Sequence, residues 1–273
     1  MKSKDNSGED LAGLSTQERE LIQYFTATEQ STVGLNDVLA LQKYPRPTAN
    51  KILSRLTRKG WLHRLKRGMY VIVPVSSPTA KPAIENAWPL AMQLFKPAFV
   101  SGWSAAEHWG LTEQIFNTLA LVTTTPQRRA VQEIGGVKFQ TKVVPKKHFF
   151  GSKVEWFGSR EVQIADPSRM IIDVLDSPAF GGGGRHTIDI VRKYWGTKYF
   201  DPPQLLNYAE RYGRGSIFKR LGFLAEESKA PVSEEWINIC RMHMSKGITK
   251  LDPDSPAKGR IVTKWKLLVN LPL

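Results

Sequence analysis

The basic segment formed by residues 43–73 places the strongest constraint on the fold of this 273-residue chain. Within residues 43–67 there are many cations and no acidic residue, so much of the formal net charge of +14 is concentrated there. Such a concentration of positive charge is typical of a surface that binds a polyanion. The cations are Lys43, Arg46, Lys51, Arg55, Arg58, Lys59, Arg64, Lys66 and Arg67.

The middle of this segment favours a short helix. Its apolar side chains follow the i, i+3, i+4, i+7 spacing of a helix that buries one face. Pro45 and Pro47 disfavour helix just upstream of Thr48, whereas Gly60 favours the end of the helix. We therefore expect a helix of about three turns with a free polar face. The apolar side chains are Ala49, Ile52, Leu53 and Leu56.

A β-hairpin is expected after the helix. The turn is predicted at Lys66-Arg67-Gly68, and the run from Met69 to Val73 favours a returning strand. A helix followed by a basic-tipped hairpin resembles the winged helix-turn-helix over residues 14–75. A basic hairpin domain that binds RNA or the ribosome, and a merely solvated charged face, are the alternatives. The combination of charge, helix periodicity and hairpin favours DNA.

The winged-helix interpretation predicts two sets of DNA contacts. The side chains expected to enter the major groove are Thr48, Asn50, Lys51, Ser54 and Arg55. The side chains expected to hold phosphates, including those at the wing tip, are Arg46, Arg58, Lys59, Arg64, Lys66 and Arg67.

The remaining N-terminal residues predict two further helices. Ser15 and Glu18 have the spacing of a capping box, so a helix should start there and bury Leu21, Ile22 and Phe25. A second short helix is expected from Asn36, which would act as its cap.

Composition changes along the chain predict its organisation. Residues 1–13 are expected to form a mobile leader, residues 14–75 the DNA-binding domain, residues 76–82 a proline-rich linker, and residues 83–273 a larger mixed domain. In this second domain helices are expected at 86–95, 104–109, 169–175, 188–194 and 203–211, with a shorter one at 216–224. Strands are expected at 119–125, 137–144 and 262–269.

The composition also narrows the class of protein. A single cysteine, Cys240, excludes an intramolecular disulfide framework and any multi-cysteine metal site. No apolar run approaches the ~18 residues of a membrane span, and the N-terminus has no apolar signal core. We therefore expect a cytoplasmic protein with no membrane partner.

Several segments of the second domain resemble the AbiEi family of type IV toxin-antitoxin, or abortive infection, systems. With the N-terminal winged helix in the same order, the resemblance covers nearly the whole chain. The segments are VSGWSAAEHWGLTEQ (100–114), the basic-rich connection into IGGVKF (134–139), IADPSRMIIDVLDSP (164–178), RLGFLAE (220–226) and KLDPDSPAKG (250–259).

The resemblance implies an α+β protein with an N-terminal winged helix-turn-helix and a larger mixed α/β C-terminal antitoxin domain. It implies a repressor that binds inverted repeats of double-stranded DNA in its own promoter. It also implies that the protein opposes a nucleotidyltransferase-like toxin without a stable complex being required. No cofactor and no enzymatic activity are implied.

Catalysis is the main competing hypothesis, in the form of a nuclease or nucleotidyltransferase delivered by a winged helix. Residues 181–184 are four glycines without the Lys-Ser/Thr of a phosphate-binding loop, so a flexible break is expected instead. Asp166, Asp173 and Asp176 suggest metal ligands, but Asp166 precedes Pro167 and is better explained as a helix cap. The other two are expected to pair with Arg169 or lie exposed.

The spacing of the remaining chemically reactive residues predicts no metal site and no catalytic triad. The histidines are dispersed without zinc or triad spacing, so no catalytic residue and no metal ligand is predicted. Trp103 and Trp109 are expected in the core. Basic pairs in the second domain, such as Lys219-Arg220 and Arg192-Lys193, predict either a solvated face or a second polyanion surface. A plain transcriptional regulator without a toxin partner is the remaining alternative.

Overall fold

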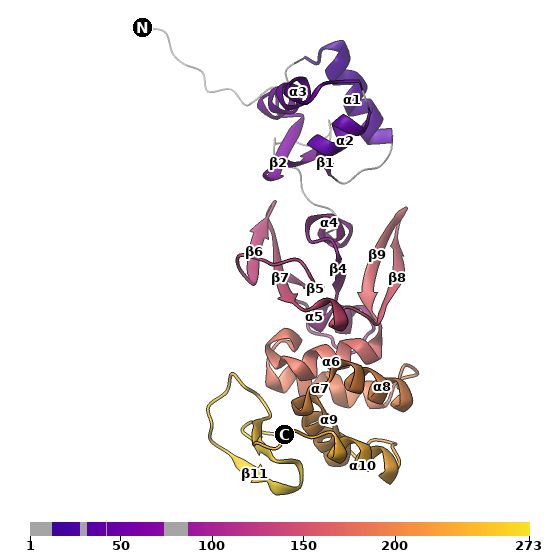
Figure 1. Ribbon diagram of the computed structural model, residues 1–273, viewed down its shortest axis with the longest axis vertical. Coiled ribbons are helices and arrows are strands. Elements are labelled where there is room, and N and C mark those ends of the chain that lie inside the picture. The colour runs from indigo at the N-terminus through magenta and orange to yellow at the C-terminus, as the bar shows by residue number, and fades with distance from the viewer. Residues whose placement is uncertain (1–12, 28–31, 42, 74–86) are drawn as a thin grey trace. The chain divides into compact units, whose positions relative to one another are not determined.

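The computed structural model describes residues 13–27, 32–41, 43–73 and 87–273 (Figure 1). The chain divides into two compact units. The first unit comprises Met1–Gln93 and Glu133–Lys138, and the second comprises Leu94–Gln132 and Phe139–Leu273. The predicted linker at residues 76–82, and all of the predicted leader except Gly13, lie outside the described residues.

Three helices and a small sheet build the described part of the N-terminal region. The sheet has the strand order β1-β3-β2 and is antiparallel. The helices bury one continuous apolar cluster, which includes every apolar residue predicted for the helix faces. The elements are α1 (Thr16–Ala27), β1 (Val33–Gly34), α2 (Leu35–Ala40), α3 (Arg46–Arg58), β2 (Leu62–Lys66) and β3 (Met69–Ile72).

The capping box at the start of α1 is confirmed. The amide of Ser15 donates to Glu18 Oε2 at 2.9 Å, and the amide of Glu18 donates to Ser15 Oγ at 3.4 Å. The predicted Asn36 cap of α2 is wrong, because the helix already begins at Leu35. Gly34 occupies the cap position, where the β1 pairing keeps its backbone extended, and its amide donates to Asp37 Oδ2 at 2.6 Å.

Helix α3 begins two residues earlier than predicted. Pro47 lies in its first turn, where a missing N–H leaves no intrahelical bond unmade, so proline does not delay the helix. The predicted end at Gly60 is confirmed by its φ of 79°. The Gly60 amide donates to Thr57 O and the Trp61 amide donates to Leu56 O, which is the Schellman pattern.

The predicted hairpin is confirmed, with a third strand that the sequence did not indicate. Strands β2 and β3 pair antiparallel up to Lys66 and Met69, and Gly68 takes a φ of 74° in the turn. Strand β1 adds to β3 through the pair Val33 and Tyr70. A strand of two residues shows no alternation of apolar and polar side chains, so the pattern was too short to detect.

A six-stranded mixed sheet has the strand order β6-β7-β5-β4-β9-β8, and most of its residues belong to the second unit. Strands β4 and β5 are antiparallel, β4 and β9 are parallel, and β8 and β9 form an antiparallel hairpin. The strands are β4 (Ala98–Val100), β5 (Thr118–Thr123), β6 (Val131–Ile134), β7 (Val137–Val143), β8 (Ser152–Phe157) and β9 (Arg160–Ala165).

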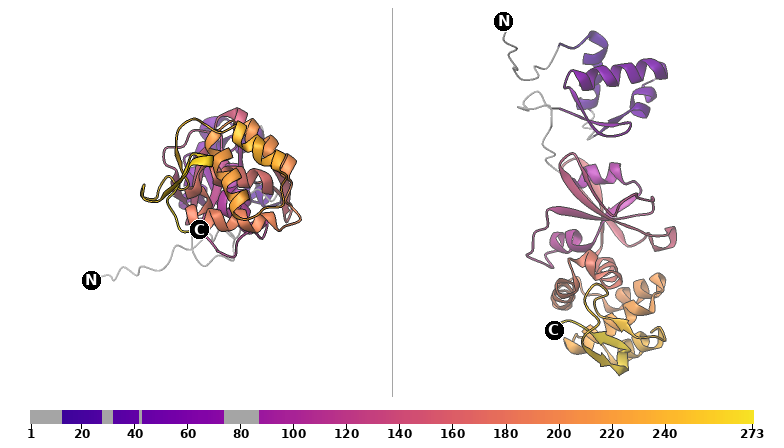
Figure 2. Two further views of the ribbon diagram at one scale, coloured as in Figure 1. Left: turned by 90° about the horizontal axis from the view of Figure 1, so that it is seen from below. Right: turned by 90° about the vertical axis from the view of Figure 1, so that its left-hand side faces the viewer.

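A layer of helices lies next to this sheet, and Figure 2 shows it from another side. A second small sheet, of order β10-β12-β11, lies beside the last helices (Figure 1). The helices of the second unit are α5 (Gly102–His108), α6 (Pro167–Asp176), α7 (Gly184–Trp195), α8 (Pro202–Tyr212), α9 (Gly215–Glu227) and α10 (Glu234–Met242). Helix α4 (Ala87–Leu94) belongs to the first unit except for its last residue. The remaining elements are the 3-10 turns η1 (Lys146–His148), η2 (Pro178–Gly181) and η3 (Thr263–Trp265) and the strands β10 (Thr249–Lys250), β11 (Arg260–Val262) and β12 (Leu267–Val269).

Three expectations for the second unit need correction. The segment 262–269 is not one strand, because η3 interrupts it to bury Trp265, whose indole donates to Glu226 Oε2 at 2.7 Å. Helix α9 is 13 residues long and is not shorter than α8, which has 11. The four glycines make a tight connection, since a Cβ on Gly181 would lie 2.3 Å from Thr187 Oγ1. Trp103 is buried as expected, whereas Trp109 is only half-buried.

Candidate nucleic-acid interface

The outer face of α3 lies opposite its buried stripe. Successive helix residues are rotated by about 100°, so Lys51, Ser54 and Arg58 fall on the face opposite the buried Ala49 and Leu56. All three outer side chains are exposed. Lys51 and Ser54 are predicted base contacts and Arg58 is a predicted phosphate contact, so the structure brings members of both predicted sets onto one surface.

The other predicted residues of α3 lie beside this face. Asn50 is exposed on one side, and Arg46 is exposed in the first turn. On the other side Thr48 is half-buried. Arg55 shares that side, and its side chain is 49% exposed.

Arg55 and Lys59 are tied to a buried carboxylate of α1. Glu18 is only 1% exposed; its Oε2 lies 2.7 Å from Lys59 Nζ, and its Oε1 lies 3.4 Å from Arg55 Nε. Lys59 Nζ also donates to Gly13 O at 2.9 Å, and its side chain is 27% exposed. The structure therefore directs Lys59 toward α1, away from the outer face of α3. From the sequence Glu18 was assigned only to the cap, and its second role depends on how α1 packs on α3.

These contacts also shift the pKa of the Glu18 carboxyl group. Burial by itself raises the pKa of Glu18, but hydrogen bonds from Lys59 and Ser15 outweigh it, and the pKa lies below its ordinary value. A carboxyl group whose folded-state pKa is lowered stabilises the fold above its unfolded-state pKa. That stabilisation is lost as the pH falls through the folded-state value.

Replacing Glu18 by Gln is expected to destabilise the N-terminal unit by about 1–3 kcal/mol near neutral pH, because a charged hydrogen-bond acceptor is lost. The difference from the unaltered chain should shrink as the pH is lowered below about 4. Calorimetric unfolding across this pH range measures both effects. Glu20→Gln is the matched control, since Glu20 is exposed on the same helix. An equal deficit at neutral and acidic pH would contradict the assignment of Glu18 as a charged partner.

The wing supplies the remaining predicted phosphate contacts. Arg64, Lys66 and Arg67 are all exposed, and they lie on β2 and in the turn that follows it. The wing thus presents three cations on one hairpin, next in sequence to the exposed face of α3. Polyanion binding is the chemistry that this arrangement supports.

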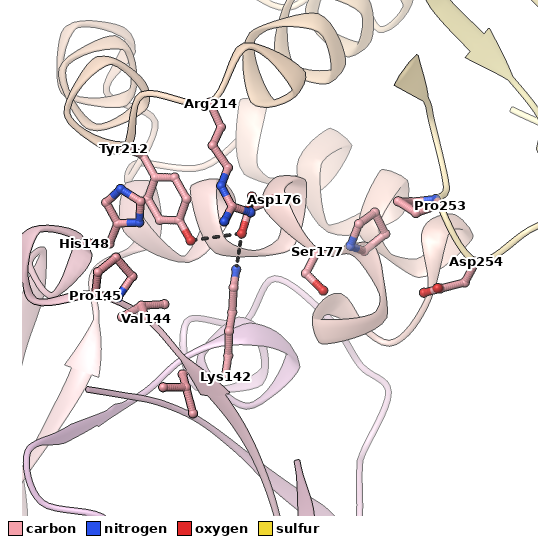
Figure 3. A pocket seen from close by; sticks show the side chains of 12 residues that line it. Lys142, Val144, Pro145, His148, Asp176, Ser177, Tyr212, Arg214, Pro253 and Asp254 are labelled. Atoms are coloured by element: carbon pink, nitrogen blue, oxygen red, sulfur yellow. Dashed lines mark hydrogen bonds and ion pairs between the residues drawn. The ribbon is translucent and has the colours of Figure 1, made fainter. Parts of the chain in front are cut away.

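Asp173 and Asp176 of α6 belong to an internal charge cluster. Arg169 and Asp173, both fully buried, pair through two contacts of 3.0 and 3.1 Å. Asp176 is contacted by Lys142 Nζ at 2.9 Å and by Arg214 Nη1 at 2.7 Å (Figure 3). Burial raises the pKa of Asp176, but Lys142 and Arg214 more than offset it, so the pKa lies below its ordinary value.

A cavity of about 390 Å³ opens over this cluster. Figure 3 shows Asp176 between Lys142, Tyr212 and Arg214, and the Tyr212 hydroxyl donates to Asp176 Oδ2 at 2.9 Å. The carboxylate is therefore surrounded by donors and cations of the protein itself.

The predicted cap role of Asp166 is confirmed. Its Oδ1 accepts from the Arg169 amide at 2.9 Å and its Oδ2 accepts from the Tyr208 hydroxyl at 2.8 Å. Asp173 pairs with Arg169, as one alternative expected, whereas the Asp176 side chain is buried and pairs with Lys142 and Arg214 instead. Each of the three aspartates thus has a structural role, and no group of three or more metal-binding side chains occurs in the part of the chain that the structure describes.

One basic pair of the second unit is not solvated. Lys219 and Arg220 are buried, and Arg220 donates to the carbonyl oxygens of Leu175 and Leu251 at 2.7 and 3.0 Å. These cations hold the C-terminal segment against the helices, so for this pair both expected surface roles are wrong. The sequence missed this because the partners are backbone carbonyls.

The three helices and the β-hairpin of the N-terminal region define a winged helix-turn-helix domain. Residues 20–73 match the family model described as "Transcriptional regulator, AbiEi antitoxin". This region therefore carries an AbiEi-type regulator domain, as the sequence resemblance predicted.

A solved structure extends the comparison of the fold to nearly the whole chain. The crystal structure of the RV2827C protein from Mycobacterium tuberculosis superposes with a TM-score of 0.65 at 14% identity. The match covers 96% of this chain and 94% of that one, and at this identity it shows a shared α+β fold. No curated protein sequence matches the chain. In the described residues, no helix is long and apolar enough to cross a membrane.

Proposed function

We propose that this protein represses its own operon by binding inverted repeats in the promoter, and that it acts as an antitoxin against a nucleotidyltransferase-like toxin. Residues 14–75 form the DNA-binding domain and residues 83–273 the antitoxin domain. The protein works in the cytoplasm and requires no stable complex with the toxin. The observation that carries the proposal is the exposed basic face of α3, beside a basic wing, in the region that matches the AbiEi regulator family.

The exposure of these side chains supports a ranking of the proposed DNA contacts. Lys51, Ser54 and Arg58 take the centre of the interface, because they lie opposite the buried stripe of α3. Arg55 contributes from the flank, where Glu18 fixes its orientation. The wing cations hold the DNA backbone, a role that positions the protein without reading sequence.

Fluorescence anisotropy on the promoter DNA and on a scrambled duplex of equal length, over a salt series, tests the DNA-binding half. We expect a preference of about a thousandfold for the promoter, with a salt slope that corresponds to several phosphates. Equal and steeply salt-dependent binding to both duplexes would contradict an operator-specific repressor.

Toxin rescue tests the antitoxin half. A full-length variant that no longer binds DNA should still protect cells that express the toxin from an unrelated promoter, because antitoxicity is assigned to the second unit. If the variant that has lost DNA binding also fails to protect the cells, the two activities are not separable. If no nucleotidyltransferase-like gene lay beside the gene for this protein, the protein would be a plain transcriptional regulator.

The enzyme alternative has one specific expectation. Metal-dependent cleavage or extension of labelled nucleic acid, abolished by Asp166→Ala, would support it. The contacts of Asp166 favour the regulator, since this carboxylate caps α6 and accepts from Tyr208.

A further inference from the structure

The β8 strand is an exposed edge of the central sheet. It is the last strand in the order β6-β7-β5-β4-β9-β8, and Figure 1 shows β8 and β9 as a projecting hairpin. Val154 and Trp156 of β8 are 43% and 63% exposed. Both point to the same face, because side chains alternate along a strand. An edge strand with exposed apolar side chains is a template for pairing with another strand.

The register of β8 on β9 determines which backbone N–H and C=O groups of β8 point away from the sheet. The Asp166 amide donates to Gly151 O at 2.8 Å, and in the register that follows Lys153 faces Ile164 and Glu155 faces Val162. Hydrogen-bonded pairs in an antiparallel ladder alternate, so the odd-numbered residues bond to β9. The N–H and C=O groups of residues 152, 154 and 156 therefore point to the outer edge.

We infer that β8 pairs with β8 of a second copy of this chain, in an antiparallel register centred on Val154. In this register Val154 faces its own counterpart and Ser152 faces Trp156, so the outward groups form about six backbone hydrogen bonds. Because the same edge of each copy is used in this self-pairing, the pairing closes as a two-fold dimer.

Charge decides the register. Centring the pair on Val154 places Lys153 opposite Glu155 of the other copy on both sides of the two-fold axis. The neighbouring register centred on Glu155 would place two glutamates opposite each other, and the register centred on Lys153 would place two lysines together. Like charges directly opposite are destabilising in a sheet, whereas opposite charges stabilise it. A lysine at a sheet edge normally discourages pairing, but here the strand itself supplies the matching anion.

The dimer is independent of the proposed function. A six-residue edge is a small interface, so the association should be weak and reversible at micromolar concentrations. A dimer carries two winged helices, which matches the two-fold symmetry of an inverted repeat. That consequence rests on the proposed function, while the pairing itself does not.

Sedimentation velocity of the full-length protein from ~1 to ~300 µM tests the inference. The sedimentation coefficient should rise with concentration toward that of a dimer. Val154→Lys, which puts two lysines together on the axis, should weaken dimerisation by about tenfold or more. The matched control is Val131→Lys, since Val131 is 52% exposed on β6 at the opposite edge and its replacement should leave the dimer unchanged.

A charge swap tests the register. Lys153→Glu alone should weaken the dimer, and the double variant Lys153→Glu with Glu155→Lys should restore it, because the pair is again complementary. A protein that stays monomeric at ~300 µM would overturn the proposed dimer. So would equal weakening by Val131→Lys and Val154→Lys, or failure of the double variant to recover.

Discussion

Replacing Lys51 and Arg58 together by glutamate is expected to weaken binding of the full-length protein to its promoter DNA by about thirtyfold or more. Both side chains are exposed at the centre of the outer face of α3. Loss of one direct DNA contact costs about 1–3 kcal/mol, and two such losses add to about 2–6 kcal/mol when the sites act independently. The salt slope should fall as well, because fewer counterions are released on binding. Anisotropy titration at several salt concentrations measures both quantities.

The control must separate a specific contact from a general loss of positive charge. Arg19→Glu with Lys43→Glu makes the same change in net charge in the same unit, at exposed positions outside α3. This control variant should bind much more tightly than the α3 variant at equal salt. If the two variants lose the same affinity, α3 does not provide the main DNA contacts.

Replacing Asp173 by alanine is expected to destabilise the second unit by about 3–5 kcal/mol, since breaking a buried ion pair leaves a buried charge unpaired. Arg169 would carry that unpaired charge. It is fully buried between aromatic rings, and its Cζ lies 4.4 Å from the centroid of the Phe150 ring. Asp173 also accepts from Ser101 Oγ at 2.8 Å, so a second donor is left without its acceptor. The thermal unfolding temperature of this unit should fall by on the order of 10 °C.

Two further variants show whether charge or volume causes this loss. Asp189→Ala on α7 changes an exposed aspartate and should alter the free energy of unfolding by less than about 0.5 kcal/mol. Arg169→Met with Asp173→Leu removes both charges and should recover most of the lost stability. A double variant as unstable as Asp173→Ala would mean that packing, and not the unpaired charge, dominates the effect.

Local patterns in the sequence predicted much of the N-terminal unit. The capping box at Ser15, the buried stripe of α3, the stop at Gly60 and the wing turn at Gly68 are confirmed. Each of these depends on residues within a few positions of one another, where propensity and hydrogen bonding act directly. Strand β1 and the two-residue shift in the start of α3 were missed, because they depend on pairing with β3 and on proline being tolerated in a first turn.

The sequence by itself determined that a basic helix and a basic hairpin follow each other, and hence the class of the N-terminal unit. It did not determine which cations are free to meet DNA. That is decided when α1 packs on α3 and brings Glu18 to Lys59 and Arg55. Likewise Asp176 of α6 became an ion-pair partner only when folding placed Lys142 and Arg214 beside it. Burial of a charge demands a partner close in space, and the positions of such partners along the chain follow no local spacing.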